Sequence, residues 1–207
     1  MFAEAMLCFT TATTALYGLR SYRLGRRCSR LGHRLRSDSL TGLGNRAALV
    51  AAFERARRSP GLLGVALGDL NGFKVLNDTH GHRFGDRVLL EVAAVLRHWA
   101  PEVNMIPFRL HGDEFALPLP DVAGHPEADR AVRCVQTAVS RLTEVDGQPI
   151  EVSMALGVVT APTTMPNLST LLAIADDRMY GDKHATGSAV SIETGGPISI
   201  EIAGLTR

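Results

Sequence analysis

The chain has 207 residues, of which 45% are hydrophobic and 21% charged, and its formal net charge at pH 7 is +1. This composition suits one globular domain with an appendage. Residues 20–36 contain seven arginines and no acid, which leaves the rest of the chain acidic. An acidic domain argues against a binder of duplex nucleic acid, which needs a basic face. The three scattered cysteines argue against a disulfide framework or a zinc site and fit a reducing compartment.

The N-terminal arm, residues 1–36, allows two interpretations. Residues 1–19 are mostly apolar, and about 19 helical residues would just cross a hydrocarbon core of roughly 30 Å. The arginines that follow would then keep the remaining chain in the cytoplasm, so that the domain would be anchored to a membrane. Alternatively, the arm is a soluble helix whose partial leucine stripe pairs with a second copy of the chain.

The rest of the chain alternates between helical and strand patterns after a turn-rich entry over 38–46. Periodic apolar residues predict helices over 47–58, 73–78, 127–143 and 168–184, and a longer one near Asp86, which would cap it. Apolar runs predict strands over 62–69, 103–109, 114–119 and 150–159, then an edge strand over 189–192 and a tail over 193–207. Residues 37–192 are therefore expected to form one α/β domain, with helices packed on an open mixed sheet that includes a β-hairpin.

Acidic residues stand at the ends of two of these strands. Asp69 follows an apolar run and precedes a turn and a helix with Lys74, whereas Asp113 and Glu114 stand at the tight turn of the hairpin. If the hairpin lies beside the first strand, Asp69 and Asp113 meet. Converging carboxylates repel each other unless a divalent cation binds them, typically Mg²⁺ (or Mn²⁺) held jointly with substrate phosphates. The sequence therefore predicts phosphate chemistry supported by a metal.

Six short motifs occur in order along this domain. They are Asp38–Arg46 (DSLTGLGNR), Asp69–Lys74 (DLNGFK), Asn77–His82 (NDTHGH), Gly85–Asp86, Arg109–Phe115 (RLHGDEF) and Ala175–Tyr180 (ADDRMY) with Lys183. Together they resemble the GGDEF family, the diguanylate cyclases, over about residues 38–192. The resemblance implies a nucleotidyl cyclase-like fold related to polymerase palm domains. It also implies that a homodimer holding one GTP per subunit makes cyclic di-GMP and pyrophosphate, as part of bacterial signal transduction.

The resemblance assigns catalytic roles to the acidic residues. Asp69 and Asp113 would ligate the metal together with the backbone carbonyl of Leu70, which would activate the attacking hydroxyl. Glu114 would have a supporting catalytic role. Adjacent side chains on a strand face opposite ways, so Glu114 would reach the same metal only if the turn twists it there.

Two further positions resemble the guanine-reading pair of the family. The carboxylate of Asp86 would accept hydrogen bonds from guanine N1 and N2, and the amide of Asn77 would donate to O6. This pairing selects guanine over adenine, because adenine would leave buried polar groups without partners. The structural alternatives are simple helix capping for Asp86 and a polar helix face for Asn77.

The remaining site residues would bind phosphates. Lys74 and Lys183 would hold the β- and γ-phosphates, helped by the backbone N–H groups of Gly72 and Phe73. Without the motifs, a lysine on a helix is ordinary solvated surface. Gly112 would keep the backbone of the signature turn close to the nucleotide.

The chain departs from the family pattern in three places. His111 replaces the first glycine of the signature, where its imidazole would either crowd the ribose or α-phosphate or point outward; the hypothesis is that turnover persists but is slow. Glu102 and Met105 replace the arginine and aspartate of the product-inhibition motif, so product feedback is not expected. Residues 183–188 lack an arginine that would hold the terminal phosphate.

These observations leave two main hypotheses for function. The first is a dimeric, Mg²⁺-dependent diguanylate cyclase, which the retained metal, guanine and lysine positions favour. The alternative is a catalytically degenerate GGDEF module that binds GTP or a partner protein as a sensor or scaffold, which His111 and the missing arginine favour. Another nucleotidyl transfer on the same fold is a third possibility.

Overall fold

The structure, a computed structural model, describes residues 35–164 and 167–187, with side chains up to residue 181. The alternatives for residues 1–34, the expected edge strand over 189–192 and the tail lie outside the described residues. Within the described ranges, no helix is both long and apolar enough to cross a membrane.

Four strands form the central sheet in the order β2-β3-β1-β6, and each neighbouring pair is antiparallel. They are β1 (Leu62–Leu70), β2 (Phe108–His111), β3 (Glu114–Leu119) and β6 (Met154–Pro162). The predicted α/β class is confirmed, although the strand pairs described here are antiparallel rather than mixed.

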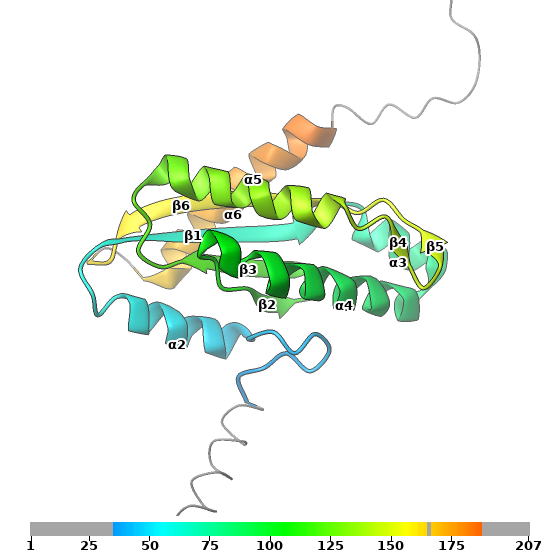
Figure 1. Cartoon of the computed structure of the whole chain (residues 1–207), viewed down its shortest axis with the longest axis horizontal. Coiled ribbons are helices and arrows are strands. Elements are labelled where there is room, and N and C mark those ends of the chain that lie inside the picture. Colours follow the sequence, from blue (N-terminus) through cyan, green and yellow to red (C-terminus); the bar gives the residue numbers. More distant parts are fainter. Residues whose placement is uncertain (1–34, 165–166, 188–207) are drawn as a thin grey trace, which may run out of the picture.

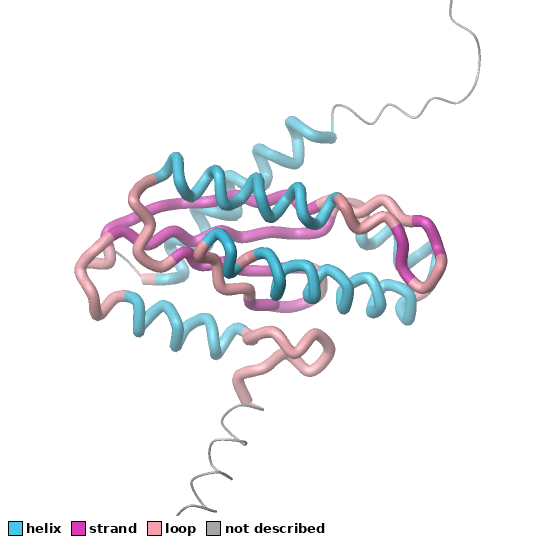
Figure 2. Tube along the Cα trace, in the orientation of Figure 1, coloured by secondary structure: helices cyan, strands magenta, loops and turns pink. Residues whose placement is uncertain are grey.

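Helices cover both faces of this sheet (Figures 1 and 2). They are α2 (Arg46–Ala56), α3 (Phe73–His80), α4 (His82–Trp99), α5 (His125–Ser140) and α6 (Leu168–Gly187). Alternate residues of β1 face opposite ways: Ala66 and Leu70 pack in one core with α4 and α5, whereas Val65 and Leu67 pack in a second core with α2 and α6. Because both faces are covered, β1 reads as a continuous apolar run.

Helix α4 begins at His82, earlier than the expected start near Asp86. Gly81 has φ 85° and joins it directly to α3, with its N–H donating to the Asn77 carbonyl at 2.8 Å. Glycine adopts a positive φ readily because it has no Cβ, and this one residue is enough to separate the two helices. Asp86 lies in the second turn of α4, so the prediction that Asp86 caps the helix is wrong.

The strand expected over 103–109 is shorter and starts later. Pro101–Val103 form a 3₁₀ turn and Asn104 has φ 56°, so the chain is not extended there and β2 begins only at Phe108. Short-range turn residues therefore override the apolar pattern.

The strand expected from residue 150 pairs with β1 only from Met154 onward. Before it, β4 (Glu144–Val145) and β5 (Gln148–Pro149) form a small hairpin that the sequence analysis did not predict. Asp146 and Gly147 at its tip both have positive φ, as in a type I′ turn.

Candidate functional site

The carboxylates of Asp69 and Glu114 lie opposite each other at the ends of two paired strands. Asp69 is the penultimate residue of β1 and Glu114 the first of β3, and the two are partners in the strand register. Directly opposite residues of an antiparallel pair have Cβ atoms about 4.5–5.5 Å apart on the same face. The hairpin therefore lies beside the first strand, but the register partner of Asp69 is Glu114 rather than Asp113. Glu114 shares a face with Asp69 through this register, and no twist of the turn is needed.

Asp113 precedes Glu114 in the turn between β2 and β3, and both are partly exposed. The pairing of the two strands shifts register between Arg109 and His111, and Gly112 has φ 51°. A left-handed conformation disfavours residues with a Cβ. The backbone of the turn itself thus requires Gly112, in addition to the closeness to a nucleotide that the sequence predicts.

His111 lies on the outside of the same turn. Its side chain is 70% exposed, and its Nε2 lies 3.0 Å from Oε2 of Glu114. Crowding of a nucleotide by His111 stays a prediction. The contact adds a second way in which His111 would slow a reaction, because it engages the carboxylate that faces Asp69.

The turn after β1 leads directly into α3. Asn71 anchors it, since its backbone N–H donates to the Ser153 carbonyl and its Nδ2 to Ser153 Oγ, each at 2.9 Å. Gly72 then takes φ 70° at the start of α3, and no described side chain caps this helix. The first N–H groups of α3, including that of Phe73, and the exposed Lys74 therefore follow closely after Asp69.

Of the two expected phosphate-binding lysines, the structure describes the side chain of Lys74 alone. Lys74 is exposed in the first turn of α3. Lys183 falls within α6, but its side chain is outside the described ones. The pairing of the two lysines on one phosphate chain therefore stays a prediction.

Asn77 lies in α3 and Asp86 in α4, and Asn77 approaches α4 at Gly85. A Cβ at Gly85 would collide with Oδ1 of Asn77, so the Asn77 amide lies against α4 immediately before Asp86. Gly85 is buried, whereas Asp86 is exposed. The structure thus places Asn77 against the residue that precedes Asp86, and the absence of a Cβ at Gly85 permits this. The guanine-reading role of the pair stays a prediction.

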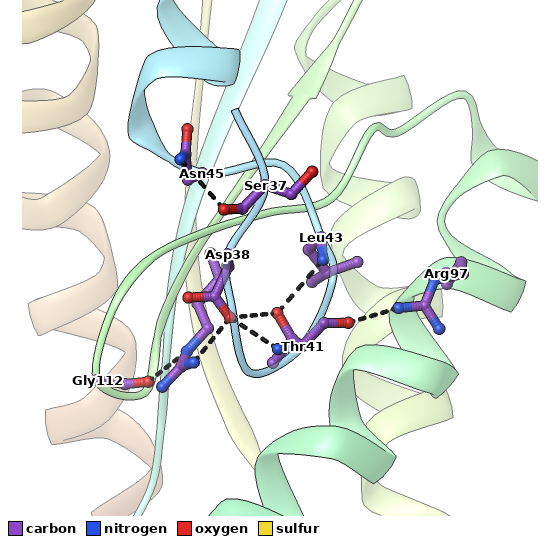
Figure 3. Close-up of polar contacts among 8 residues, drawn as sticks. Ser37, Asp38, Thr41, Leu43, Asn45, Arg97 and Gly112 are labelled. Atoms are coloured by element: carbon purple, nitrogen blue, oxygen red, sulfur yellow. Dashed lines mark hydrogen bonds and ion pairs between the residues drawn. The ribbon is translucent and has the colours of Figure 1, made fainter. Parts of the chain in front are cut away.

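A buried arginine, for which no role was predicted, connects the signature turn to the entry segment. Arg109 is 9% exposed. Its Nη1 donates to Oδ1 of Asp38 at 2.8 Å, and its Nε donates to the Gly112 carbonyl at 2.8 Å. The same Asp38 oxygen accepts from the Thr41 N–H at 2.8 Å and from Thr41 Oγ1 at 2.7 Å (Figure 3). Asp38 and Arg109 each begin one of the six motifs. The position of an arginine among the apolar residues of a strand could have indicated that Arg109 has a buried partner.

These contacts predict a pH dependence of stability. Burial raises the pKa of Asp38, but hydrogen bonds from Thr41 and Arg109 outweigh it and hold that pKa below its ordinary value. The stabilisation is therefore complete above the unfolded-state pKa of about 3.9 and is lost as the pH falls through the folded-state pKa. Asp38→Asn removes it, so the gap in unfolding free energy between wild type and variant should narrow below pH 4, roughly. Urea titrations at several pH values check this, and a gap independent of pH contradicts it.

The donor set at the strand ends fits a hard divalent cation. Asp69, Asp113 and Glu114 would supply carboxylate oxygens, and the backbone carbonyl of Leu70 would be a further oxygen donor. Mg²⁺ typically takes one or two protein carboxylates and completes its octahedron with water and substrate phosphates. Within the described part of the chain, these residues included, no three histidine, cysteine, aspartate or glutamate side chains are grouped closely enough to hold a metal ion. The joint ligation of a metal by Asp69 and Asp113 therefore stays a prediction.

The positions of the product-inhibition motif also have defined surroundings. Met105 is 1% exposed and belongs to the core with α4 and α5, whereas Glu102 is exposed. A buried thioether offers no carboxylate to a ligand. The absence of product feedback stays a prediction.

The antiparallel sheet, its helical layers and the acids at the hairpin turn define a nucleotidyl cyclase-like domain. Residues 35–189 match the family described as "Diguanylate cyclase, GGDEF domain". The chain belongs to the GGDEF family.

Relatives and solved structures agree with this assignment. An uncharacterized 19.3 kDa protein from the repSA 5′ region of Streptomyces ambofaciens is 36% identical over 149 residues, 72% of this chain and 78% of that protein. Diguanylate cyclase TpbB of Pseudomonas aeruginosa is 34% identical over 176 residues, 81% of this chain. A structure of TpbB that comprises only the GGDEF domain has a TM-score of 0.65 and 32% identity, and covers 72% of this chain and 89% of that one. The chain spans only 40% of the length of TpbB.

Proposed function

We propose that the chain is a diguanylate cyclase, which joins two GTP molecules into cyclic di-GMP and releases two pyrophosphates. The observation that supports this most is the pairing of Asp69 with Glu114, with Asp113 in the adjoining turn. In each half of the reaction, the 3′-oxygen of one GTP bonds to the α-phosphorus of the other. The bond from that phosphorus to the bridging oxygen of pyrophosphate breaks, and the hydroxyl proton is lost.

The acidic residues would serve this reaction together. Asp69, Asp113 and the Leu70 carbonyl would hold Mg²⁺ or Mn²⁺, which when bound supplies charge neutralisation on the phosphates and a more acidic attacking hydroxyl. Glu114 would support these ligands from the same face of the sheet. Lys74 and Lys183 would hold the terminal phosphates, next to the first N–H groups of α3 at Gly72 and Phe73.

The specificity for guanine would come from Asn77 and Asp86. Asn77 lies against α4 at Gly85, directly before Asp86. An amide and a carboxylate would match the O6 acceptor and the N1 and N2 donors of guanine, whereas adenine presents the reverse pattern at positions 6 and 1 and has no amino group at position 2.

The reaction would need two chains, because each domain would present one GTP to the other. We infer a homodimer, with the arm over 1–36 bringing the two domains together either as paired helices or as a membrane anchor. In both cases the domain itself would face the cytoplasm.

The experiment that tests the function is incubation of the purified full chain, and of the fragment 35–207, with GTP and Mg²⁺. Products are separated by chromatography and identified by mass. Cyclic di-GMP from either preparation supports the enzyme, and product from the full chain alone places dimerisation in the arm. No product from either one overturns the proposal.

The contact of His111 with Glu114 favours a second candidate, a GGDEF module that binds GTP or a partner without turnover. This module would retain the guanine and phosphate contacts, but its acidic residues would not be arranged to hold the metal for catalysis. Calorimetry with GTP that shows binding in the absence of product would establish it.

Replacing His111 by glycine should increase turnover. The variant releases the Glu114 oxygen that lies 3.0 Å from the imidazole, and it also removes any crowding of the nucleotide. We expect kcat to rise only several-fold, because the His111 side chain is largely exposed and water weakens its contact with Glu114. The Mg²⁺ concentration for half-maximal rate should fall. Initial rates over a Mg²⁺ titration check both, with His98→Gly, an exposed histidine on α4, as the control. An unchanged rate contradicts this role of His111.

A further inference from the structure

Arg109 lies between the turn that carries Asp113 and the segment by which the chain enters the domain. Figure 3 shows Gly112 on one side of the entry loop and Arg97 on the other, with Asp38 and Thr41 between them. The Arg109 guanidinium reaches Asp38 at 2.8 Å and the Gly112 carbonyl at 2.8 Å. At 9% exposed it is shielded from water, so these charge-assisted hydrogen bonds are strong.

The hydrogen bond to Gly112 acts directly on Asp113. The Gly112 carbonyl and the Asp113 N–H belong to one planar peptide unit, so fixing the oxygen fixes the plane from which the Asp113 side chain departs. The backbone of Gly112 has a positive φ, and a glycine can adopt many backbone conformations. The hydrogen bond from Arg109 to the Gly112 carbonyl favours one of these conformations.

The other end of the network is held by the start of the domain. Asn45 caps α2, and its Nδ2 also donates to the carbonyls of Leu35 at 3.0 Å and Ser37 at 3.3 Å. Its own N–H donates to the Arg36 carbonyl at 2.9 Å. Hydrogen bonds to Asn45 thus hold residues 35–37, and the next residue along the chain, Asp38, binds Arg109, which in turn binds the signature turn.

We propose that Arg109 is a positioning residue for Asp113 and that Asp38 in turn positions Arg109, which makes the entry segment part of the catalytic apparatus. This inference rests on the proposed cyclase function. Arg97 provides a matched control, because its Nη2 donates to the Thr41 carbonyl of the same loop at 2.7 Å. Within the described residues it makes no hydrogen bond to the signature turn.

The test compares Arg109→Gln, Arg109→Lys, Asp38→Asn and Arg97→Gln in the full chain. We expect Arg109→Gln to lower kcat about 30- to 100-fold with KM for GTP within about threefold, since the loss acts through the geometry of the turn. Arg109→Lys, which lacks the planar fork, should restore only part of the rate. Asp38→Asn should add nothing to Arg109→Gln, because the two act as one unit.

The control and a second readout make the outcomes decisive. Equal loss of kcat in Arg97→Gln and Arg109→Gln, or additive losses for Asp38→Asn and Arg109→Gln, overturns the inference. Hydrogen exchange of the amides over 111–114 should accelerate in Arg109→Gln and Asp38→Asn but not in Arg97→Gln. If the wild type makes no cyclic di-GMP, the proposed function fails. The exchange data then decide separately whether Arg109 positions the turn, and unchanged protection overturns that claim.

Discussion

Asp113→Ala is expected to abolish turnover while the domain stays folded. The residue lies in the turn between β2 and β3, beside the paired carboxylates of Asp69 and Glu114, and is only partly buried. Its loss removes a carboxylate from the expected metal site, an effect of several kcal/mol on transition-state charge, or a rate reduction on the order of 10³. The measurement is the rate of cyclic di-GMP formation from GTP at saturating Mg²⁺.

Two comparisons separate this effect from general damage. Glu91→Ala removes an exposed acid from α4 and should leave the rate within about twofold, since surface substitutions rarely cost much. Circular dichroism and urea unfolding should show that Asp113→Ala retains its structure. Undiminished synthesis in Asp113→Ala would refute the metal assignment, because the reaction would then not need the carboxylate of Asp113.

Much of the fold could be predicted because the apolar pattern of β1 identifies it as a central strand. Its run Val65–Leu67 has apolar residues toward both faces, which only a central strand covered by helices on each side requires. The bounds of α2, α3, α5 and α6 differ from expectation by at most three residues. The errors fall at glycine and proline turns. Gly81, with its positive φ, moved the start of α4, and the turn at Asn104 removed residues 103–107 from an expected strand. Neither conformation follows from apolar spacing.

For the candidate site, too, some features follow from the sequence and others depend on the three-dimensional structure. The residue types at Asp69 and Asp113 indicated a metal site, but the partner of Asp69 depends on a strand register that no local pattern sets. The contact of His111 with Glu114 depends on the register shift in β2, which the sequence does not show. Arg109 illustrates a further limit, since the burial of a charged side chain depends on a carboxylate 71 residues away in the chain.

Gly85→Ala is expected to weaken GTP binding without destabilising the domain. Alanine favours a helix interior over glycine by about 1 kcal/mol, so α4 itself gains. The added Cβ collides with Oδ1 and Cγ of Asn77 and comes tightly against Phe73, so the Asn77 side chain must rotate away. This offsets part of the gain in α4. The amide then no longer meets guanine O6, and an unpaired buried polar group costs about 1–3 kcal/mol, so GTP affinity should fall roughly 10- to 100-fold.

Calorimetry with GTP and with ATP measures both the affinity and the discrimination between the bases. We expect the loss to fall on GTP and the ratio of the two affinities to approach one, since Asn77 distinguishes the bases at position 6. Gly181→Ala is the matched control: Gly181 also lies in a helix, α6, but a Cβ there meets nothing within 4 Å. That control should bind GTP like the wild type. If Gly85→Ala also does so, Asn77 is not held in place by Gly85 for reading the base, and the guanine specificity must come from Asp86 alone.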